Sequence, residues 1–133
     1  MTFFLGIPEA SWKVDVPSFV SARRLRRRVA SPWQPALKPW AIDSGGFTEI
    51  DKFGSWQTSP EQYADEVCMW SEQRGLLEWA SPQDWMCEPE MLEKTGLPVE
   101  EHQEKSIASV LRLRELQSDV NVIPVLQGWD PGD

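Results

Sequence analysis

Three short apolar segments, each followed by a polar residue, constrain the fold of this chain more than any other feature. Segments 40–42, 76–80 and 121–126 lead into Asp43, Asp84 and Gln127. Asp43 and Asp84 are 41 positions apart, and Asp84 and Gln127 are 43 positions apart. Each interval holds a strand, a helix and the return to the next strand. Strands that alternate with helices pair in parallel through right-handed crossovers, so the pattern predicts an α/β fold.

The segments between these strands carry helix signals. Ser59 is a good N-cap, Pro60 suits the first helical position, and Gln62 completes a capping box, which predicts a helix over 60–74 that ends at Gly75. Tyr63, Val67 and Trp70 lie on one face of this helix. A short helix is expected over 89–94 and a longer one over 98–117. Strands are also expected at 3–5 and 18–21, and an irregular connection at 31–39.

The length of the chain limits how much of a known architecture it can form. A TIM-type (β/α)8 barrel needs about 250 residues, and this chain has 133 residues with four or five predicted strands. The sequence therefore predicts the first half of such a barrel, with residues 1–133 as a single incomplete domain. Ligands of these sheets bind at the carboxyl ends of the strands, where Asp43, Asp84 and Gln127 are expected to converge.

The first of these ends has the residue types that a flat polar ligand needs. In Asp43-Ser44-Gly45-Gly46-Phe47, two glycines bare the backbone of a loop between a carboxylate and an aromatic ring. The ring can stack on the face of the ligand while the carboxylate accepts hydrogen bonds from its edge. Two structural interpretations stay open: Asp43 caps the following turn, or Asp84 caps the helix near Pro89.

Charge bears on the choice of partner. The net charge of −8 argues against a large nonspecific nucleic-acid interface. The basic residues are uneven, however, and five of the thirteen fall within six positions: Arg23, Arg24, Arg26, Arg27 and Arg28. This cluster either neutralises several phosphates or forms a solvated surface, and the sequence favours neither.

The remaining composition limits location and chemistry. No apolar run approaches the roughly 20 residues of a membrane span, and the N-terminus lacks the basic region of a signal peptide. Cys68 and Cys87 are the only cysteines and have no C-x-x-C spacing, which favours a reducing, cytoplasmic setting. Cys68 is expected in the core, and His102 on the exposed side of a helix. Trp70 and Trp79 are expected to pack internally, with Trp85 and Trp129 as candidates for a pocket mouth.

Taken in order, three motifs resemble the tRNA-guanine (queuine) transglycosylase family, most closely its phage and bacterial relatives that handle 7-deazaguanine bases. The motifs are Asp43-Ser44-Gly45-Gly46-Phe47, Gln83-Asp84-Trp85-Met86-Cys87-Glu88-Pro89 and Pro124-Val125-Leu126-Gln127-Gly128. The start of the chain and the segments 95–97 and 101–103 are similar to the phage-associated branch as well. The resemblance covers nearly all of the chain.

The resemblance implies a TIM-type barrel and a base exchange, in which guanine in tRNA or DNA is replaced by a 7-deazaguanine derivative. It implies that Asp43 contacts the incoming base and assists proton transfer, and that Phe47 stacks on it. Asp84 would hold the amino and N–H edge of the base, and Gln127 its carbonyl side, with Gly128 allowing close approach. Ser44, Gly45 and Gly46 complete the implied base-binding set.

The chain also departs from the family. The nucleophilic aspartate belongs to the second half of the barrel, and the zinc site of three cysteines and one histidine has no counterpart, since Cys68, Cys87 and His102 lack ligand spacing. No cofactor is therefore expected in this chain, and zinc only in a full-length relative. A noncatalytic base- or nucleic-acid-binding subunit remains an alternative. An open sheet edge would also allow the chain to form a homo-oligomer.

Overall fold

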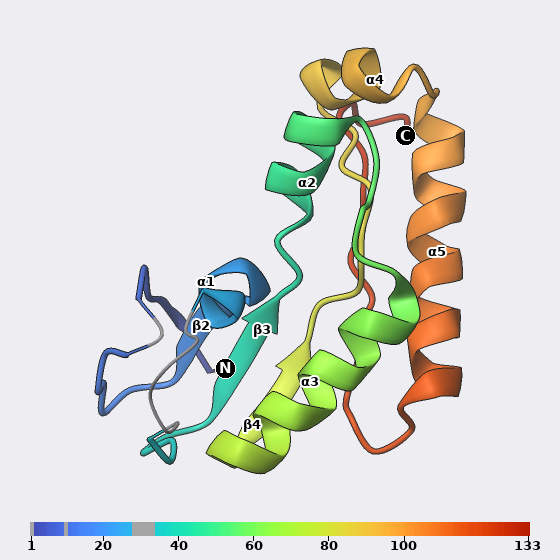
Figure 1. Ribbon diagram of the computed structural model, residues 1–133. Coiled ribbons are helices and arrows are strands. Elements are labelled where there is room, and N and C mark those ends of the chain that lie inside the picture. Colours follow the sequence, from blue (N-terminus) through green and yellow to red (C-terminus); the bar gives the residue numbers. More distant parts are fainter. Residues whose placement is uncertain (1, 10, 28–33) are drawn as a thin grey trace.

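Four parallel strands, flanked by helices, organise the computed structural model, which describes residues 2–9, 11–27 and 34–133 (Figure 1). The strands lie side by side in chain order: β1 (Leu5–Gly6), β2 (Ser18–Ser21), β3 (Trp40–Asp43) and β4 (Leu77–Ala80). All three neighbouring pairs are parallel. The α/β prediction is confirmed, and sequential parallel strands with helical crossovers are consistent with half of a (β/α)8 barrel.

The helices follow the predicted pattern with two additions. The predicted helices are α3 (Pro60–Arg74), α4 (Pro89–Thr95) and α5 (Val99–Leu116), and the additions are α1 (Ala22–Arg26) and α2 (Gly46–Phe53). Both added helices are short, and neither has a side-chain hydrogen bond at its N-cap, so their sequences carry no clear start signal. In α3, by contrast, the Ser59 hydroxyl accepts a hydrogen bond from the Gln62 amide at 3.1 Å, as predicted.

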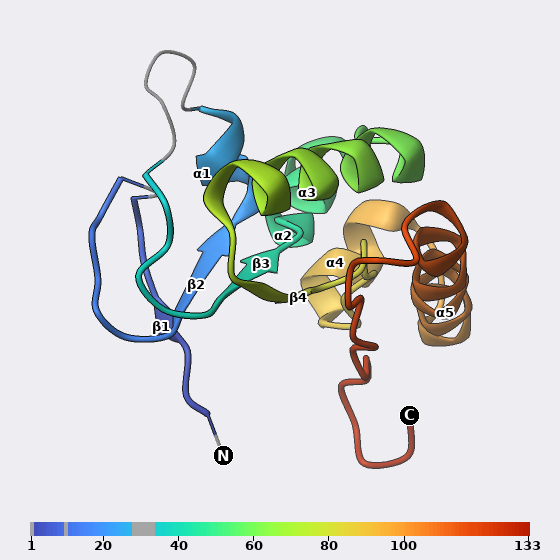
Figure 2. The same ribbon diagram turned by 90° about the horizontal axis from the view of Figure 1, so that it is seen from below.

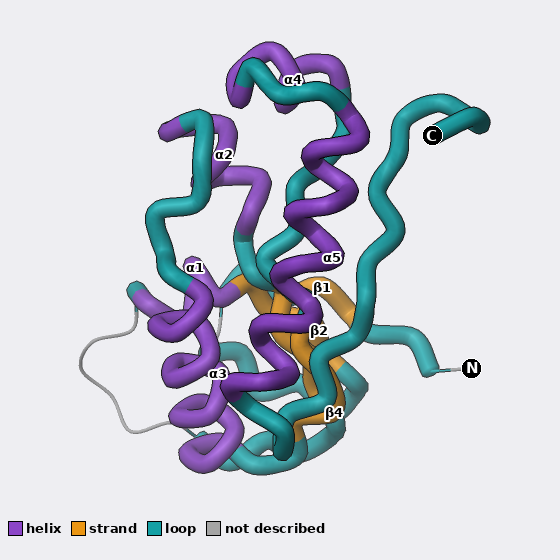
Figure 3. Tube along the Cα trace, turned by 90° about the vertical axis from the view of Figure 1, so that its right-hand side faces the viewer, coloured by secondary structure: helices purple, strands orange, loops and turns teal. Residues whose placement is uncertain are grey.

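The predicted strand over 121–126 is wrong for most of its length. Only an isolated parallel bridge joins Val122 to Ala80. The Ala80 amide donates to the Asn121 carbonyl at 3.0 Å, and the Ile123 amide donates to the Ala80 carbonyl at 3.1 Å. Pro124 has no amide hydrogen to continue this ladder, so the chain leaves the sheet and runs alongside α5 (Figure 3).

One face of the sheet forms the main core. Helices α1 and α3 lie on this face (Figure 2), and Leu25 and Tyr63 from them pack with Val20 and Ile42 of the strands. Trp70 is buried in the same cluster, as predicted. Cys68, which was expected in the core, is only partly buried, because it lies beside Glu72 on the outer side of α3.

The other face of the sheet carries aromatic rings. Phe19, Ala41 and Trp79 share one register across β2, β3 and β4. Since alanine is small, the rings of Phe19 and Trp79 meet over it, with centroids 5.2 Å apart. Phe4 meets Trp79 edge-on at 5.4 Å. Trp79 thus packs against neighbouring rings, as predicted, although it is only half-buried.

Among the described residues, no helix has the length and apolarity that crossing a membrane requires.

Candidate functional site

The carboxyl ends of β3 and β4 and the C-terminal segment bring together three of the predicted site residues. The Ser44 amide donates to Ser81 Oγ at 2.8 Å, which ties the end of β3 to the end of β4. Ser44 Oγ donates to Asp84 Oδ1 at 3.4 Å, and Gln127 Nε2 donates to Asp84 Oδ2. The segment after β4 and the C-terminal segment run side by side in this region (Figure 1). Asp84 is therefore the centre of the cluster.

Asp84 is also the electrostatically unusual member of this cluster. Burial raises its pKa above the ordinary value, and the neighbouring carboxylate of Asp43 raises it further. Hydrogen bonds from Ser44 and Gln127 act in the opposite direction without cancelling the shift. The buried phenol of Tyr63, which donates to the Ser81 carbonyl at 2.9 Å, has its pKa raised by burial and then by Asp43. Asp43 therefore belongs to the same electrostatic cluster as Asp84.

The two glycines after Asp43 have different structural roles. Gly45 adopts a left-handed conformation with φ of 84°, which favours glycine, and a β-carbon on it would lie 3.1 Å from Ser21 Oγ. Gly46 begins α2, and a β-carbon there would lie 2.6 Å from Trp56 Cζ2. Trp56 Nε1 in turn donates to the Asp84 carbonyl at 3.1 Å. Gly46 thus allows α2 to start directly against the ring that contacts the Asp84 backbone.

Two other predicted residues lie at the edge of this cluster. The sequence predicts a loop at Gly45 and Gly46, but α2 already begins at Gly46, so Phe47 lies in its first turn with 54% of its surface exposed. Gly128 is exposed in the C-terminal segment, and a β-carbon there would lie 3.1 Å from Cβ of Asp133. Trp129, a candidate for the pocket mouth, is 59% exposed.

Helix α5 holds the segment around Asp84 through three side chains that sequence analysis missed. Ser109 Oγ accepts from the Gln83 amide at 3.0 Å, and Ser106 Oγ accepts from the Trp85 amide at 2.8 Å. His102 Nδ1 donates to the Met86 carbonyl at 2.7 Å. The three side chains lie at i, i+4 and i+7, so they share one face of the helix. That spacing of polar residues is the signal that could have revealed them.

The expected exposure of His102 is accordingly wrong. Its side chain is fully buried, and Nε2 makes a hydrogen bond of 2.7 Å with Thr95 Oγ1 at the end of α4. The ring also meets Trp85 edge-on, with centroids 5.4 Å apart. Buried imidazoles need partners for both nitrogens, and His102 finds one in the segment that follows Asp84 and the other at the end of α4. It therefore fixes α4, α5 and that segment together.

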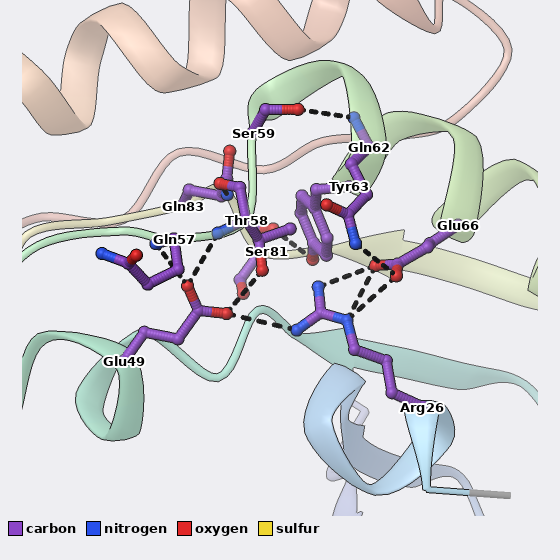
Figure 4. A network of polar contacts seen from close by, with 10 residues as sticks. All are labelled: Arg26, Glu49, Gln57, Thr58, Ser59, Gln62, Tyr63, Glu66, Ser81 and Gln83. Carbon is purple, nitrogen blue, oxygen red and sulfur yellow. Dashed lines mark hydrogen bonds and ion pairs between the residues drawn. The ribbon is translucent and has the colours of Figure 1, made fainter. Parts of the chain in front are cut away.

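A polar network centred on Arg26 joins α1, α2 and α3 (Figure 4). The Arg26 guanidinium contacts the Glu66 carboxylate at 2.7 Å and the Glu49 carboxylate at 3.3 Å. Glu49 also accepts hydrogen bonds from the amides of Gln57 and Thr58 at 2.8 and 3.0 Å. The Thr58 carbonyl accepts from Gln83 Nε2 at 2.8 Å, so the network reaches the residue before Asp84.

Glu49 is ionised more readily than an ordinary glutamate because of this network. Burial acts to raise its pKa, but hydrogen bonds from the Thr58 hydroxyl and from the amides of Thr58 and Gln57 outweigh burial, and the charge of Arg26 adds to them. The pKa of Glu49 is therefore lowered.

A family model for DeoxyPurine in DNA protein A (DpdA) matches the chain over residues 1–133. The chain belongs to the DpdA family. This family modifies DNA with 7-deazaguanine bases and is related to tRNA-guanine transglycosylase, so the predicted resemblance is confirmed at that level. Searches of curated proteins and of solved structures give no significant match to this chain. The DpdA family implies DNA and a deazaguanine as substrates.

The arginine cluster is only partly available to such a DNA substrate. Arg26 forms ion pairs with Glu49 and Glu66 inside the network, so it is less available to a phosphate than its exposed neighbours. Arg23, Arg24 and Arg27 are exposed. Arg23 lies over the start of α2, where its Nη1 donates to Thr48 Oγ1 at 3.1 Å. Arg28 lies outside the described residues.

The zinc site of the tRNA enzymes is not matched by the residues that the structure describes. Within the described ranges, no group of three or more His, Cys, Asp or Glu side chains is arranged to hold a metal ion. His102 uses both nitrogens in hydrogen bonds, Cys87 is buried, and Cys68 lies on the outer side of α3. These three residues do not fit a zinc centre.

Proposed function

We propose that this DpdA-family chain carries the base-recognition part of a transglycosylase that replaces guanine in DNA with a 7-deazaguanine derivative. The observation that carries the proposal is the contact of Gln127 with Asp84 at the carboxyl ends of the strands, with Ser44 on the other carboxylate oxygen. A carboxylate and an amide side by side provide an acceptor and a donor, which together complement the donors and the carbonyl of a guanine edge.

The chemistry of the base accounts for each residue type. The ring N–H and amino group of a guanine-like base are adjacent donors, which the Asp84 carboxylate accepts. The exocyclic carbonyl accepts from the Gln127 amide. An entering base replaces the Gln127–Asp84 hydrogen bond with its own pair. Asp43 supplies a second carboxylate, which the resemblance assigns to contact with the base and proton transfer.

The remaining site residues complete the proposal. Ser44 orients Asp84, Gly45 and Gly46 allow the turn and the close packing with which α2 starts beside it, and Gly128 allows close approach of the base. Phe47, on the exposed side of α2, stacks on the base that has left the DNA. Arg23, Arg24 and Arg27 contact phosphates.

The proposal places recognition in residues 1–133, as one domain that forms half of a barrel, and the nucleophilic aspartate in the other half. The resemblance implies that division. Completion of the sheet, by that second half or by a second copy of the chain, covers the edge of the sheet beyond β4. In this arrangement the chain itself requires no cofactor.

Binding of free 7-deazaguanine to the chain tests the recognition step. Isothermal titration calorimetry on the wild type, Asp84→Asn and the matched control Asp65→Asn, an exposed aspartate on α3, isolates the role of one carboxylate. We expect Asp84→Asn to weaken binding about a hundredfold, because a charge-assisted pair of hydrogen bonds is lost, and Asp65→Asn to leave it unchanged. Equal affinity of wild type and Asp84→Asn would refute the site.

Catalysis is tested separately from recognition. Double-stranded DNA carrying labelled guanine is incubated with the full-length protein and 7-deazaguanine, and release of the label is followed. Release that depends on 7-deazaguanine and on Asp84 supports base exchange. Binding of 7-deazaguanine without any release supports the noncatalytic binding subunit instead.

A further inference from the structure

A groove lies beside the Asp84 segment, between α5 and the start of α3. It has a volume of about 370 Å³, within the range of ligand-binding pockets. Figure 1 shows the first turn of α3 next to α5, and residues from both helices line the groove. The residues that matter to the argument are Trp56, Trp85, Lys105, Ala108, Ser109 and Arg112.

The wall formed by α5 combines two cations with two small residues. Lys105, Ala108, Ser109 and Arg112 lie at i, i+3, i+4 and i+7, so they form one stripe along the helix. Ala108 and Ser109 leave space in the middle of the stripe, and the cations lie at its ends. The acidic residues Glu100, Glu101 and Glu104 fall outside this lining.

The opposite wall presents two half-buried indoles. Trp56 and Trp85 both line the groove, and Lys105 Nζ lies 5.1 Å from the centroid of the Trp85 ring. Aromatic rings beside cations are the features with which proteins bind single-stranded nucleic acid, since bases stack on the rings and phosphates pair with the cations.

Existing contacts of the cations do not prevent such binding. Arg112 contacts Glu61 at 2.7 Å and Glu115 at 3.3 Å, and all three side chains are about half exposed or more. Exposed ion pairs of this kind contribute little to stability, so a phosphate can replace either carboxylate. Lys105 Nζ lies over the Trp85 ring, and a cation on a flexible stem can turn from it toward a phosphate.

The groove shares its walls with the candidate site. Gln83 and Trp85, which line the groove, are the neighbours of Asp84 in sequence, and Trp56 Nε1 donates to the Asp84 carbonyl at 3.1 Å. A ligand in the groove therefore contacts residues adjacent in sequence to Asp84, the residue proposed to hold the exchanged base. Removing a base from the duplex also leaves the neighbouring bases without a stacking partner.

We infer that this groove binds a nucleotide that flanks the exchanged guanine in the DNA strand. The base stacks against Trp56 and Trp85, and Lys105 and Arg112 pair with the adjoining phosphates. This inference rests on the proposed function, because it takes DNA as the substrate. Stacking reads no base edge, so the groove supplies affinity and positioning for any flanking sequence.

Charge neutralisation in the groove tests the phosphate contacts. A fluorescein-labelled single-stranded oligodeoxynucleotide is titrated with the wild type, Lys105→Gln/Arg112→Gln and the control Lys13→Gln/Lys38→Gln, while anisotropy is recorded at several salt concentrations. The control removes the same charge from exposed residues near the amino end of the sheet. We expect about tenfold weaker binding for the groove variant, with a salt slope lower by about 1.4, and less than twofold weakening for the control. Equal affinities of the two variants would overturn the inference.

Photocrosslinking tests the stacking contact directly. The same oligodeoxynucleotide with 5-iodouracil in place of thymine is irradiated with the protein, and mass spectrometry locates the crosslinks. Crosslinks at Trp56 or Trp85 support the inference, and crosslinks confined to other residues overturn it. These experiments do not use the base site, so the two proposals can fail separately. If the wild type fails to bind 7-deazaguanine, the proposed function is contradicted. If the groove variant binds the oligonucleotide as tightly as the wild type, only the groove inference is contradicted.

Discussion

Replacement of Gly46 by alanine tests whether the approach of α2 to Trp56 shapes the site. The added β-carbon would lie 2.6 Å from Trp56 Cζ2 and 3.2 Å from the Asp84 carbonyl oxygen, so the indole must move. Trp56 cannot move freely, because it packs against the cluster of Ile50, Met86 and Met91 and donates to the Asp84 carbonyl.

The magnitude follows from three contributions. Overpacking costs about 1–3 kcal/mol, and loss of the indole hydrogen bond costs about 0.5–1.5 kcal/mol. Alanine returns at most about 1 kcal/mol of helix propensity. We therefore expect Gly46→Ala to lower the free energy of unfolding by about 2 kcal/mol, measured by urea denaturation.

A second variant identifies the cause of this loss. Trp56→Phe removes the atom that the new β-carbon would meet, so the two substitutions should be non-additive. We expect a coupling free energy of about 1–2 kcal/mol in the double-mutant cycle. Gly6→Ala, where no atom lies within 4 Å of the added carbon, serves as the control and should change stability by less than about 0.5 kcal/mol. Wild-type stability of Gly46→Ala, or strict additivity with Trp56→Phe, would refute the packing argument.

Three further substitutions have defined outcomes. The pKa of Asp84 is raised in the folded state, so its effect on stability is most favourable below its unfolded pKa and declines as the pH rises through the folded pKa. In urea denaturation, Asp84→Asn should therefore gain stability relative to wild type as the pH rises from about 3 to about 7. A stability difference that stays constant over this range would contradict the shift. The pKa of Glu49 is lowered in the folded state, so its stabilising contribution is present above its unfolded pKa and is lost as the pH falls through its folded pKa. Glu49→Gln should therefore be less stable than wild type at pH 7 and should lose less stability on acidification. Glu72→Gln, at an exposed glutamate, serves as the control. Ser59→Ala removes the N-cap of α3 and should cost about 1 kcal/mol in thermal denaturation, whereas an unchanged melting temperature would show that the cap contributes nothing.

Local signals in the sequence were sufficient for the elements with strong start and stop residues. Helix α3 begins and ends where predicted, with Ser59 and Pro60 at its start and Gly75 after its end, since capping depends on neighbours within one turn. The same local logic failed for α2, where Gly45 and Gly46 indicate a loop. That helix is stabilised by contacts from elsewhere in the chain, including the Arg26–Glu49 ion pair and the packing of Ile50.

The candidate site, too, could be predicted from the sequence only in part. The order of the three motifs predicted that Asp84 and Gln127 lie near one another, because parallel strands place their carboxyl ends at one edge of the sheet. It could not reveal that His102, Ser106 and Ser109 hold the Asp84 segment, because those contacts join a helix to an irregular segment about twenty residues away. Nor could it separate Arg26 from its neighbours, since five arginines within six positions look alike until the fold pairs one of them with Glu49 and Glu66.

Periodicity, caps and strand spacing by themselves determined the α/β class, the parallel sheet and the three main helices. Those features depend on short-range preferences and on the side-chain periodicities of helices and strands. Tertiary structure decided where the segment after Pro124 leaves the sheet, which arginine is neutralised, and how buried hydrogen bonds hold Asp84. Those outcomes depend on which distant groups meet when polar atoms lose water, and each buried donor or acceptor must then find a partner across the fold.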